Sequence, residues 1–294
     1  MNLKKFKGSL LFILRVLISF GILFYLFKKT DWEKLRAIIS NLQISYYLLA
    51  LGCVITFQML VALRWRTICK AWNFEASFRY YLKNYLLGFS INTVFPGIVA
   101  GDTLRSIFLT RSGLDWKKAG FSVLLDRGLG LMGILLILSI SLPLGDHFLP
   151  QPLKLFLYTV SYGSIIGFLI LSLLFKFLNR DFFKPLEIPT VFKPLLLGLI
   201  IQVLFVFQFI FLGLALNFSI KPNYYFIIIP IISFLSALPI SISGLGLREG
   251  TLSYFLFLLN YPLEYGLSLG LLAYSLILLS SLPGIFVYLR GRWK

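Results

Sequence analysis

The chain has 294 residues, of which 59% are hydrophobic and 13% charged, whereas a typical soluble domain is about 45–50% apolar and roughly 25% charged. This composition excludes a soluble globular fold and indicates an integral membrane protein. Its net charge of +17 favours anionic membrane lipids as neighbours, and because the bases are scattered at the ends of apolar segments, no nucleic-acid partner is predicted.

Long uninterrupted apolar segments predict membrane-spanning helices rather than the alternating strands of a β-barrel. Six full spans are expected, at residues 8–27, 44–63, 119–142, 153–177, 195–216 and 263–289. A short amphipathic helix after the first span is expected to begin with a capping box, with Thr30 as N-cap and Glu33 at the third position. The bases before the first span and after the last one predict that both termini are cytoplasmic. Residues 1–294 are expected to form a single integral membrane domain.

Helix-breaking residues and charges interrupt the apolar pattern at residues 96–105. Residues 78–94 lead into Pro96, Gly97 and Gly101, which disfavour a continuous spanning helix. Because the basic segments before and after this region are both expected in the cytoplasm, it must enter and leave the membrane on the same side. It therefore predicts a broken or re-entrant helical hairpin, whose irregular backbone is tolerated only inside protein or along a cavity.

A second stretch, at residues 239–249, repeats this layout. The two stretches share the pattern P-x4-G-x3-R, and an acid lies close to each. In the first stretch these residues are Pro96, Gly101 and Arg105, with Asp102 as the acid. In the second they are Pro239, Gly244 and Arg248, with Glu249 as the acid. Residues 224–260 are therefore expected to form a second hairpin, which enters from the opposite side. Two such motifs predict an inverted-topology repeat with a substrate site near the membrane midplane.

The polar residues of both stretches are the candidate substrate-binding residues. Backbone N–H groups at the two matched glycines are expected to face an anionic ligand, and the two matched arginines to donate to a phosphodiester. The adjacent pair Asp126-Arg127 is a further candidate, with a purely structural ion pair as the alternative. The full predicted set is Asn92, Gly101, Asp102, Arg105, Asp126, Arg127, Ser243, Gly244, Gly246, Arg248 and Glu249.

Other reactive residues are too isolated to indicate chemistry. Cys53, Cys69 and His147 stand far apart in the sequence, so neither a disulfide framework nor a metal site is predicted. The chain has no G-x-x-x-x-G-K-[ST] phosphate loop, which excludes ATP as a direct energy source. No nucleophile–base pair stands out, so no catalytic residue and no cofactor are predicted.

At these motifs the chain resembles the membrane region of lysylphosphatidylglycerol synthases, a flippase-like family that includes stand-alone members without the synthase. The resemblance rests on Asn92, Pro96 through Arg105, Asp126-Arg127-Gly128, Pro239 and Ser243 through Glu249. It implies a polytopic helical domain that moves a phospholipid or another lipid-linked headgroup between leaflets. The chain is expected to be a stand-alone member, without the soluble aminoacyl-transfer domain of the fused synthases, so lysyl-phosphatidylglycerol is not assumed as its substrate.

Composition, motifs and resemblance together favour a lipid flippase in the cytoplasmic membrane. The expected partners are an anionic phospholipid or lipid-linked substrate and the surrounding membrane lipids, and the sequence leaves open whether the protein forms a homo-oligomer. Two other functions remain: a membrane enzyme acting on a lipid headgroup or polyprenyl phosphate, and a non-transporting partner in lipid or cell-envelope synthesis. The intramembrane charges argue against the last, since it gives no reason to retain them.

Overall fold

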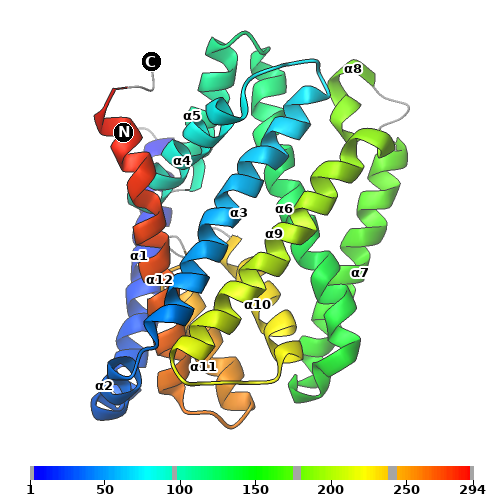
Figure 1. Ribbon diagram of the computed structural model, residues 1–294. Coiled ribbons are helices and arrows are strands. Elements are labelled where there is room, and N and C mark those ends of the chain that lie inside the picture. Colours follow the sequence, from blue (N-terminus) through cyan, green and yellow to red (C-terminus); the bar gives the residue numbers. More distant parts are fainter. Residues whose placement is uncertain (1–2, 95–97, 175–179, 238–243, 292–294) are drawn as a thin grey trace.

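The computed structural model describes residues 3–94, 98–174, 180–237 and 244–291, and within these ranges it is helical without strands. The helices form one upright bundle (Figure 1), in which α1 begins and α12 ends at the upper end. The elements are α1 (Leu3–Lys29), α2 (Trp32–Ser40), α3 (Ile44–Lys70), α4 (Phe78–Val94), α5 (Ile98–Arg111), α6 (Trp116–Gly145), η1 (Asp146–Phe148), α7 (Gln151–Leu174), α8 (Arg180–Phe183), η3 (Lys184–Leu186), α9 (Ile188–Ala215), α10 (Pro222–Ala237), α11 (Leu247–Leu258) and α12 (Leu263–Leu289). The predicted all-helical class is confirmed.

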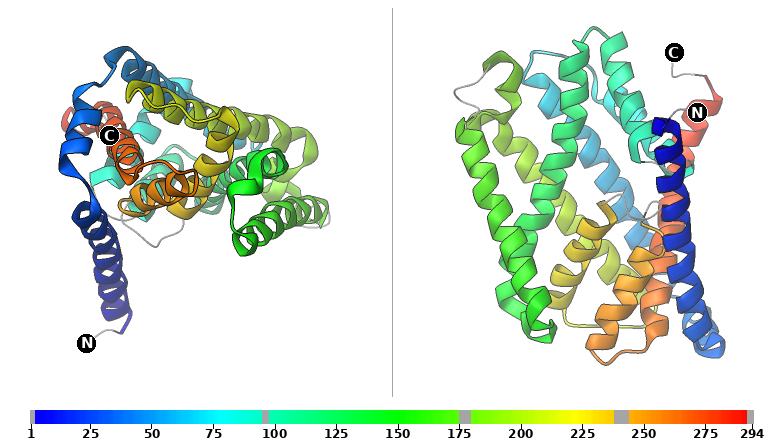
Figure 2. Two further views of the ribbon diagram at one scale, coloured as in Figure 1. Left: turned by 90° about the horizontal axis from the view of Figure 1, so that it is seen from below. Right: turned by 180° about the vertical axis from the view of Figure 1, so that it is seen from behind.

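Among the described residues, five helices are long and apolar enough to cross a membrane, namely α3, α6, α7, α9 and α12. Each coincides with one of the six predicted spans. The sixth corresponds to α1, a helix of 27 residues that stands at the edge of the bundle (Figure 2). At about 1.5 Å per residue, helices of this length exceed the roughly 30 Å hydrocarbon core of a bilayer. The chain is therefore a multi-pass membrane protein.

Two helical hairpins complete the bundle and approach its middle from opposite ends. The pair α4–α5 occupies the upper half and the pair α10–α11 the lower half (Figure 1). The predicted helix at residues 78–94 matches α4 at both ends. Pro96, Pro239 and Ser243 lie outside the described residues.

The helix packing has an internal two-fold pattern. The helices α3, α4, α5 and α6 correspond to α9, α10, α11 and α12, in that order. Whenever two of these eight helices are in contact, their two counterparts are in contact as well. For example, α4 packs on α12 just as α10 packs on α6, and α3 packs directly on α9. Such a correspondence, with the hairpins at opposite ends, is what an inverted-topology repeat requires.

The buried apolar residues fall into an upper and a lower core. The lower core surrounds α10 and includes Phe209, Leu212 and Ile227. The upper core surrounds α4 and α5 and includes Trp65 and Tyr81, which make an edge-to-face ring contact. The upper core also encloses most of the buried charge described below.

The beginning of α2 differs by one residue from the prediction. The N-cap is Asp31, whose carboxylate accepts hydrogen bonds from the N–H groups of Glu33 and Lys34 at 3.1 and 3.2 Å. Thr30 instead donates its hydroxyl proton to the carbonyl of Leu26 at the end of α1. The predicted capping box at Thr30 is therefore wrong, because that hydroxyl terminates the preceding helix.

Candidate functional site

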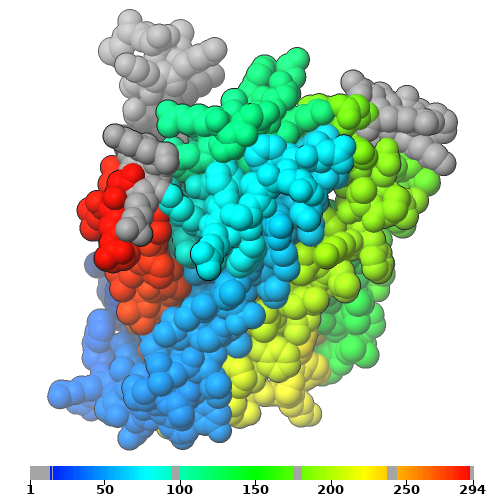
Figure 3. Space-filling model, turned by 45° about the horizontal axis from the view of Figure 1, so that its top comes forward, coloured from blue at the N-terminus to red at the C-terminus, as the bar shows by residue number. Residues whose placement is uncertain are grey.

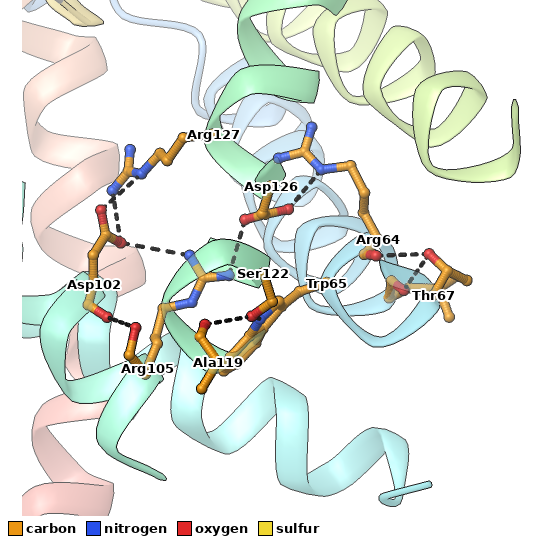
Figure 4. Close-up of polar contacts among 11 residues, drawn as sticks. Arg64, Trp65, Thr67, Asp102, Arg105, Ala119, Ser122, Asp126 and Arg127 are labelled. Atoms are coloured by element: carbon orange, nitrogen blue, oxygen red, sulfur yellow. Dashed lines mark hydrogen bonds and ion pairs between the residues drawn. The ribbon is translucent and has the colours of Figure 1, made fainter. Parts of the chain in front are cut away.

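Five charged side chains from α3, α5 and α6 form a connected cluster in the upper half of the bundle (Figure 4). Asp126 lies between two arginines. One of its carboxylate oxygens accepts a hydrogen bond from Nε of Arg64 at 2.8 Å, and the other accepts one from Nη2 of Arg105 at 2.9 Å. Since Arg64 belongs to α3, Arg105 to α5 and Asp126 to α6, this carboxylate joins three helices.

Asp102 is the second acid of the cluster and holds the outer arginine. Nε and Nη2 of Arg127 donate to its two carboxylate oxygens at 3.0 and 3.1 Å, in a bidentate arrangement. Nη1 of Arg105 forms an ion pair with the same carboxylate at 3.5 Å (Figure 4). We refer to Arg64, Asp102, Arg105, Asp126 and Arg127 as the upper ion cluster. With three arginines and two aspartates, it carries a formal charge of +1.

Most of the upper ion cluster is removed from solvent. Arg64, Arg105 and Asp126 are 5%, 2% and 1% exposed. The guanidinium carbon of Arg105 lies 4.2 Å from the ring centre of Trp65 and 5.5 Å from that of Tyr85. These aromatic faces stabilise a cation whose hydration has been lost.

The buried donors of the cluster are not all used. Nη1 of Arg64 and Nε of Arg105 are buried without a hydrogen-bond partner among the described residues. A buried donor without an acceptor costs about 1–3 kcal/mol, and more when the group is charged. The cluster therefore has an excess positive formal charge and two buried guanidinium donors that the described residues leave unused.

The sequence did not identify Arg64 as part of the site. The predicted span ends at residue 63, one residue before Arg64, but α3 continues to Lys70. The guanidinium of Arg64 lies against Gly130 of α6 and Gly198 of α9, where a methyl group would approach its nitrogens to about 3.3–3.5 Å. The position of two glycines opposite an arginine is a tertiary feature that no local pattern contains.

Gly101 and Asn92 have a structural role in this hairpin. The N–H of Gly101 donates to Oδ1 of Asn92 at 2.8 Å, so Asn92 caps the first turn of α5. A Cβ atom at Gly101 would overlap the backbone of Gly88 on α4. The expectation that this amide faces an anionic ligand is thereby corrected: the glycine lets two helices approach closely, and its N–H is already bonded within the hairpin.

The second motif forms a separate and smaller cluster, which we call the lower ion pair. Nε and Nη2 of Arg248 donate to Oε1 of Glu249 at 3.1 and 2.9 Å, and Oε2 of Glu249 accepts the N–H of Gly246 at 2.7 Å. Arg248 and Glu249 are both buried, and Arg248 also lies 5.6 Å from the ring of Tyr274 on α12. Both carboxylate oxygens thus have partners, and the pair caps the start of α11.

The matched motifs do not have the same position relative to their helices. Gly101 lies inside α5, three residues after its first residue Ile98, whereas Gly244 precedes the first residue of α11, Leu247, by three. Gly244 and Gly246 have φ values of +78° and +81°, a region that favours glycine. The sequence pattern therefore repeats, but the helix start is shifted by six residues between the two copies.

The two clusters lie at different levels of the bundle. Gly270 of α12 lies against Glu249, whereas Gly284 lies against α4 at Leu86 and Ser90. The fourteen residues between these α12 positions correspond to about 20 Å of helix. Among the described residues, no polar contact links the upper ion cluster with Arg248.

The fold and the buried charges define a class of protein: a polytopic helical membrane protein with a pseudo-symmetric pair of hairpins and an ionic site between helices. Residues 12–284 match the family described as the lysylphosphatidylglycerol synthase TM region, and the chain belongs to that family. This confirms the resemblance that the sequence motifs indicated.

A curated relative shows a weaker similarity. The chain is 23% identical over 176 residues to a UPF0104 membrane protein of Methanocaldococcus jannaschii. The match covers 58% of this chain and 51% of the relative. The matched region thus spans about half the length of that protein.

Proposed function

We propose that this protein is a lipid flippase, which moves a phospholipid or a lipid-linked anionic headgroup between the two leaflets of the cytoplasmic membrane, with both termini on the cytoplasmic side. The observation that carries the proposal is the upper ion cluster, with its charge of +1 and its unpartnered donors on Arg64 and Arg105. Charges at membrane depth are costly, and they are retained where they face a substrate path or a partner.

The chemistry of the cluster fits a phosphate group. Guanidinium groups bind phosphate oxygens through paired, charge-assisted hydrogen bonds, and three of them surround two carboxylates here. A bound phosphodiester would supply the negative charge that the cluster lacks. The surplus cation is Arg127, which is half exposed and can therefore be reached by an anion from outside the cluster.

The inverted arrangement of the hairpins supports transport rather than catalysis. Transporters with such repeats expose one site alternately to the two sides as one half moves against the other. The upper ion cluster would then be the binding site on this path, while the lower ion pair, whose carboxylate oxygens are already bonded, caps the start of α11. Membership in a family named for the membrane region of a lipid synthase is consistent with a lipid as the transported molecule.

The experiment is reconstitution into vesicles with trace fluorescent phosphatidylglycerol, followed by dithionite quenching of outer-leaflet label. Protein-free vesicles lose about half of their fluorescence, and vesicles with an active flippase lose nearly all of it. An Asp126→Asn variant that remains monodisperse should flip lipid more slowly, because it leaves two buried arginines without their shared anion. Wild-type vesicles that quench like protein-free vesicles would contradict the proposal, and a chemically altered lipid would indicate an enzyme instead.

A further inference from the structure

We infer that the groove between α5 and α6 is where a phospholipid headgroup reaches the upper ion cluster, and that Asp102 occupies the phosphate position on Arg127 until a lipid replaces it. The inference rests on the proposed function, because it names the substrate class and the access route of the same site. It concerns residues at the surface of the cluster, on the side where α5 and α6 pack against each other.

The groove is a hollow of about 400 Å³ near the upper end of the bundle, within the range of about 300–1,000 Å³ that small-molecule sites occupy. Figure 3 shows the surfaces of α5 and of the start of α6 at this end of the molecule. The α5 wall consists of Thr103, Ser106, Ile107 and Thr110, and the α6 wall of Trp116 and Gly120. The guanidinium-bearing Arg111 lies at the upper mouth.

Asp102 and Arg127 do not line this groove but follow it along the same two helices, four residues before Ser106 on α5 and seven residues after Gly120 on α6. Trp116, Gly120 and Arg127 are separated by four and seven residues, so they follow one face of α6. Arg127 is eleven residues beyond Trp116, which is about 16 Å along the helix and roughly half the thickness of a bilayer core. Its side chain is nevertheless 51% exposed, while its partner Asp102 is only 18% exposed. A half-exposed arginine at that depth requires a polar path or an anionic neighbour.

The surroundings of the groove fit a lipid rather than a free anion. Ile107, Trp116 and Leu124 are exposed at 39%, 67% and 69%, and they offer apolar surface for an acyl chain beside the polar lining. A phospholipid combines that apolar part with a phosphate, which complements Arg111 in the groove lining and Arg127 beyond it. A free phosphate ion would gain nothing from the apolar surface.

The hydroxyl groups of the lining indicate which headgroup is preferred. Ser106 donates its proton to the carbonyl of Asp102 at 3.2 Å, and Thr110 donates its own to the carbonyl of Ser106 at 3.0 Å. While these bonds are made, both hydroxyl oxygens retain lone pairs that accept hydrogen bonds from a ligand. A headgroup with hydrogen-bond donors, such as glycerol or a primary amine, fits this lining better than choline, which has none.

Exchange at Arg127 connects the groove with the buried part of the cluster. Asp102 pairs with Arg127 on the outside and with Arg105 on the inside. When a phosphate replaces the carboxylate at Arg127, Asp102 becomes available to Arg105 alone. Arrival of a lipid thereby changes the charge balance around the buried arginines without any covalent step.

The test measures phosphatidylglycerol retained by the purified protein in native mass spectrometry, with phosphatidylcholine as the competing probe. Arg127→Gln should lower retention about tenfold, the equivalent of one charge-assisted hydrogen bond. The matched control Arg79→Gln removes an exposed arginine from the start of α4 and should leave retention unchanged. Thr110→Trp fills the groove, leaves Arg127 in place and should also lower retention.

The variant Asp102→Asn distinguishes two roles of the Asp102 carboxylate: competition with the lipid phosphate for Arg127, and a purely structural ion pair. Loss of a competing carboxylate should raise phosphatidylglycerol retention, whereas loss of a purely structural ion pair would lower it together with Arg127→Gln. Ser106→Ala with Thr110→Val should reduce the preference for phosphatidylglycerol over phosphatidylcholine. Equal retention by wild type, Arg127→Gln and Thr110→Trp overturns the inference.

The failure of this inference differs from the failure of the proposed function. If wild-type vesicles flip lipid while Thr110→Trp and Arg127→Gln flip it at the same rate, the groove is not the route, although the protein is a flippase. If retention depends on Arg127 but wild-type vesicles flip nothing, the lipid site stands and the transport function does not.

Discussion

The two hairpins occupy equivalent places in the packing pattern, but their charges are arranged for different tasks. The upper ion cluster has more arginines than acids, buried donors without a partner in the described part of the chain, and one half-exposed guanidinium. The lower ion pair is neutral, and both oxygens of Glu249 are bonded, one to Arg248 and one to the N–H of Gly246. A symmetric scaffold can therefore carry an open binding site in one half and a closed helix cap in the other.

The largest difference between the halves should appear when the shared acid of the upper cluster is removed. Asp126→Leu leaves Arg64 and Arg105 buried without their common partner, and breaking a buried pair in this way costs about 3–5 kcal/mol. We expect most of this variant to aggregate on extraction. Size-exclusion chromatography in detergent measures the monodisperse fraction. A variant as monodisperse as the wild type would show that the arginines do not depend on Asp126.

A smaller difference is expected at the matched glycines. Gly101→Ala places a methyl group into the backbone of Gly88, and since α4 and α5 must move apart, the cost should be about 1–3 kcal/mol. At Gly244 the obstacle is the positive φ of +78°, which asparagine tolerates better than most residues. Gly244→Asn should therefore be milder than Gly101→Asn. The thermal unfolding midpoints of Gly101→Asn and Gly244→Asn measure this difference. An equal fall in midpoint for both variants would contradict the separate roles of the two glycines.

The smallest effect is expected when the lower pair is neutralised as a whole. Replacing a buried ion pair by neutral groups of similar shape is often close to neutral in stability. The double variant Arg248→Gln with Glu249→Gln should thus unfold at nearly the wild-type temperature, since the glutamine amide oxygen can still accept from Gly246. The single variant Arg248→Gln should be less stable than the double one. If the double variant is the less stable of the two, the lower pair is more than a self-compensating cap.

The sequence predicted the helices well wherever an apolar segment ended at a clear local signal. The predicted segment at residues 78–94 coincides with α4, and the five spans confirmed by the structure follow continuous hydrophobic runs. The end of α3 was missed because Arg64 and Trp65 look like membrane-boundary residues. In the fold they are buried against Asp126 and Ser122 of α6, about sixty residues away in the sequence.

The candidate site was predictable as a set of residues but not as a geometry. The charges of Asp102, Arg105, Asp126 and Arg127 were identified because charged residues inside apolar segments are conspicuous, and the structure brings these four together. Their separation from Arg248 was not foreseeable, because a repeated pattern of proline, glycine and arginine does not specify where each helix begins. The use of the Gly101 amide by Asn92 likewise depends on how closely α4 and α5 pack.

The asymmetry between the halves is tested most directly by lipid flipping in matched vesicles that contain either Arg105→Lys or the double variant Arg248→Gln with Glu249→Gln. Lysine keeps the charge at residue 105 but lacks the planar guanidinium fork that reaches both Asp126 and Asp102 and lies over the Trp65 ring. We expect Arg105→Lys to slow flipping about tenfold, which corresponds to an increase of about 1.4 kcal/mol in the activation free energy. The double variant should flip lipid at close to the wild-type rate. Equal rates for Arg105→Lys and wild type, with a slow double variant, would place the transport site in the lower half instead.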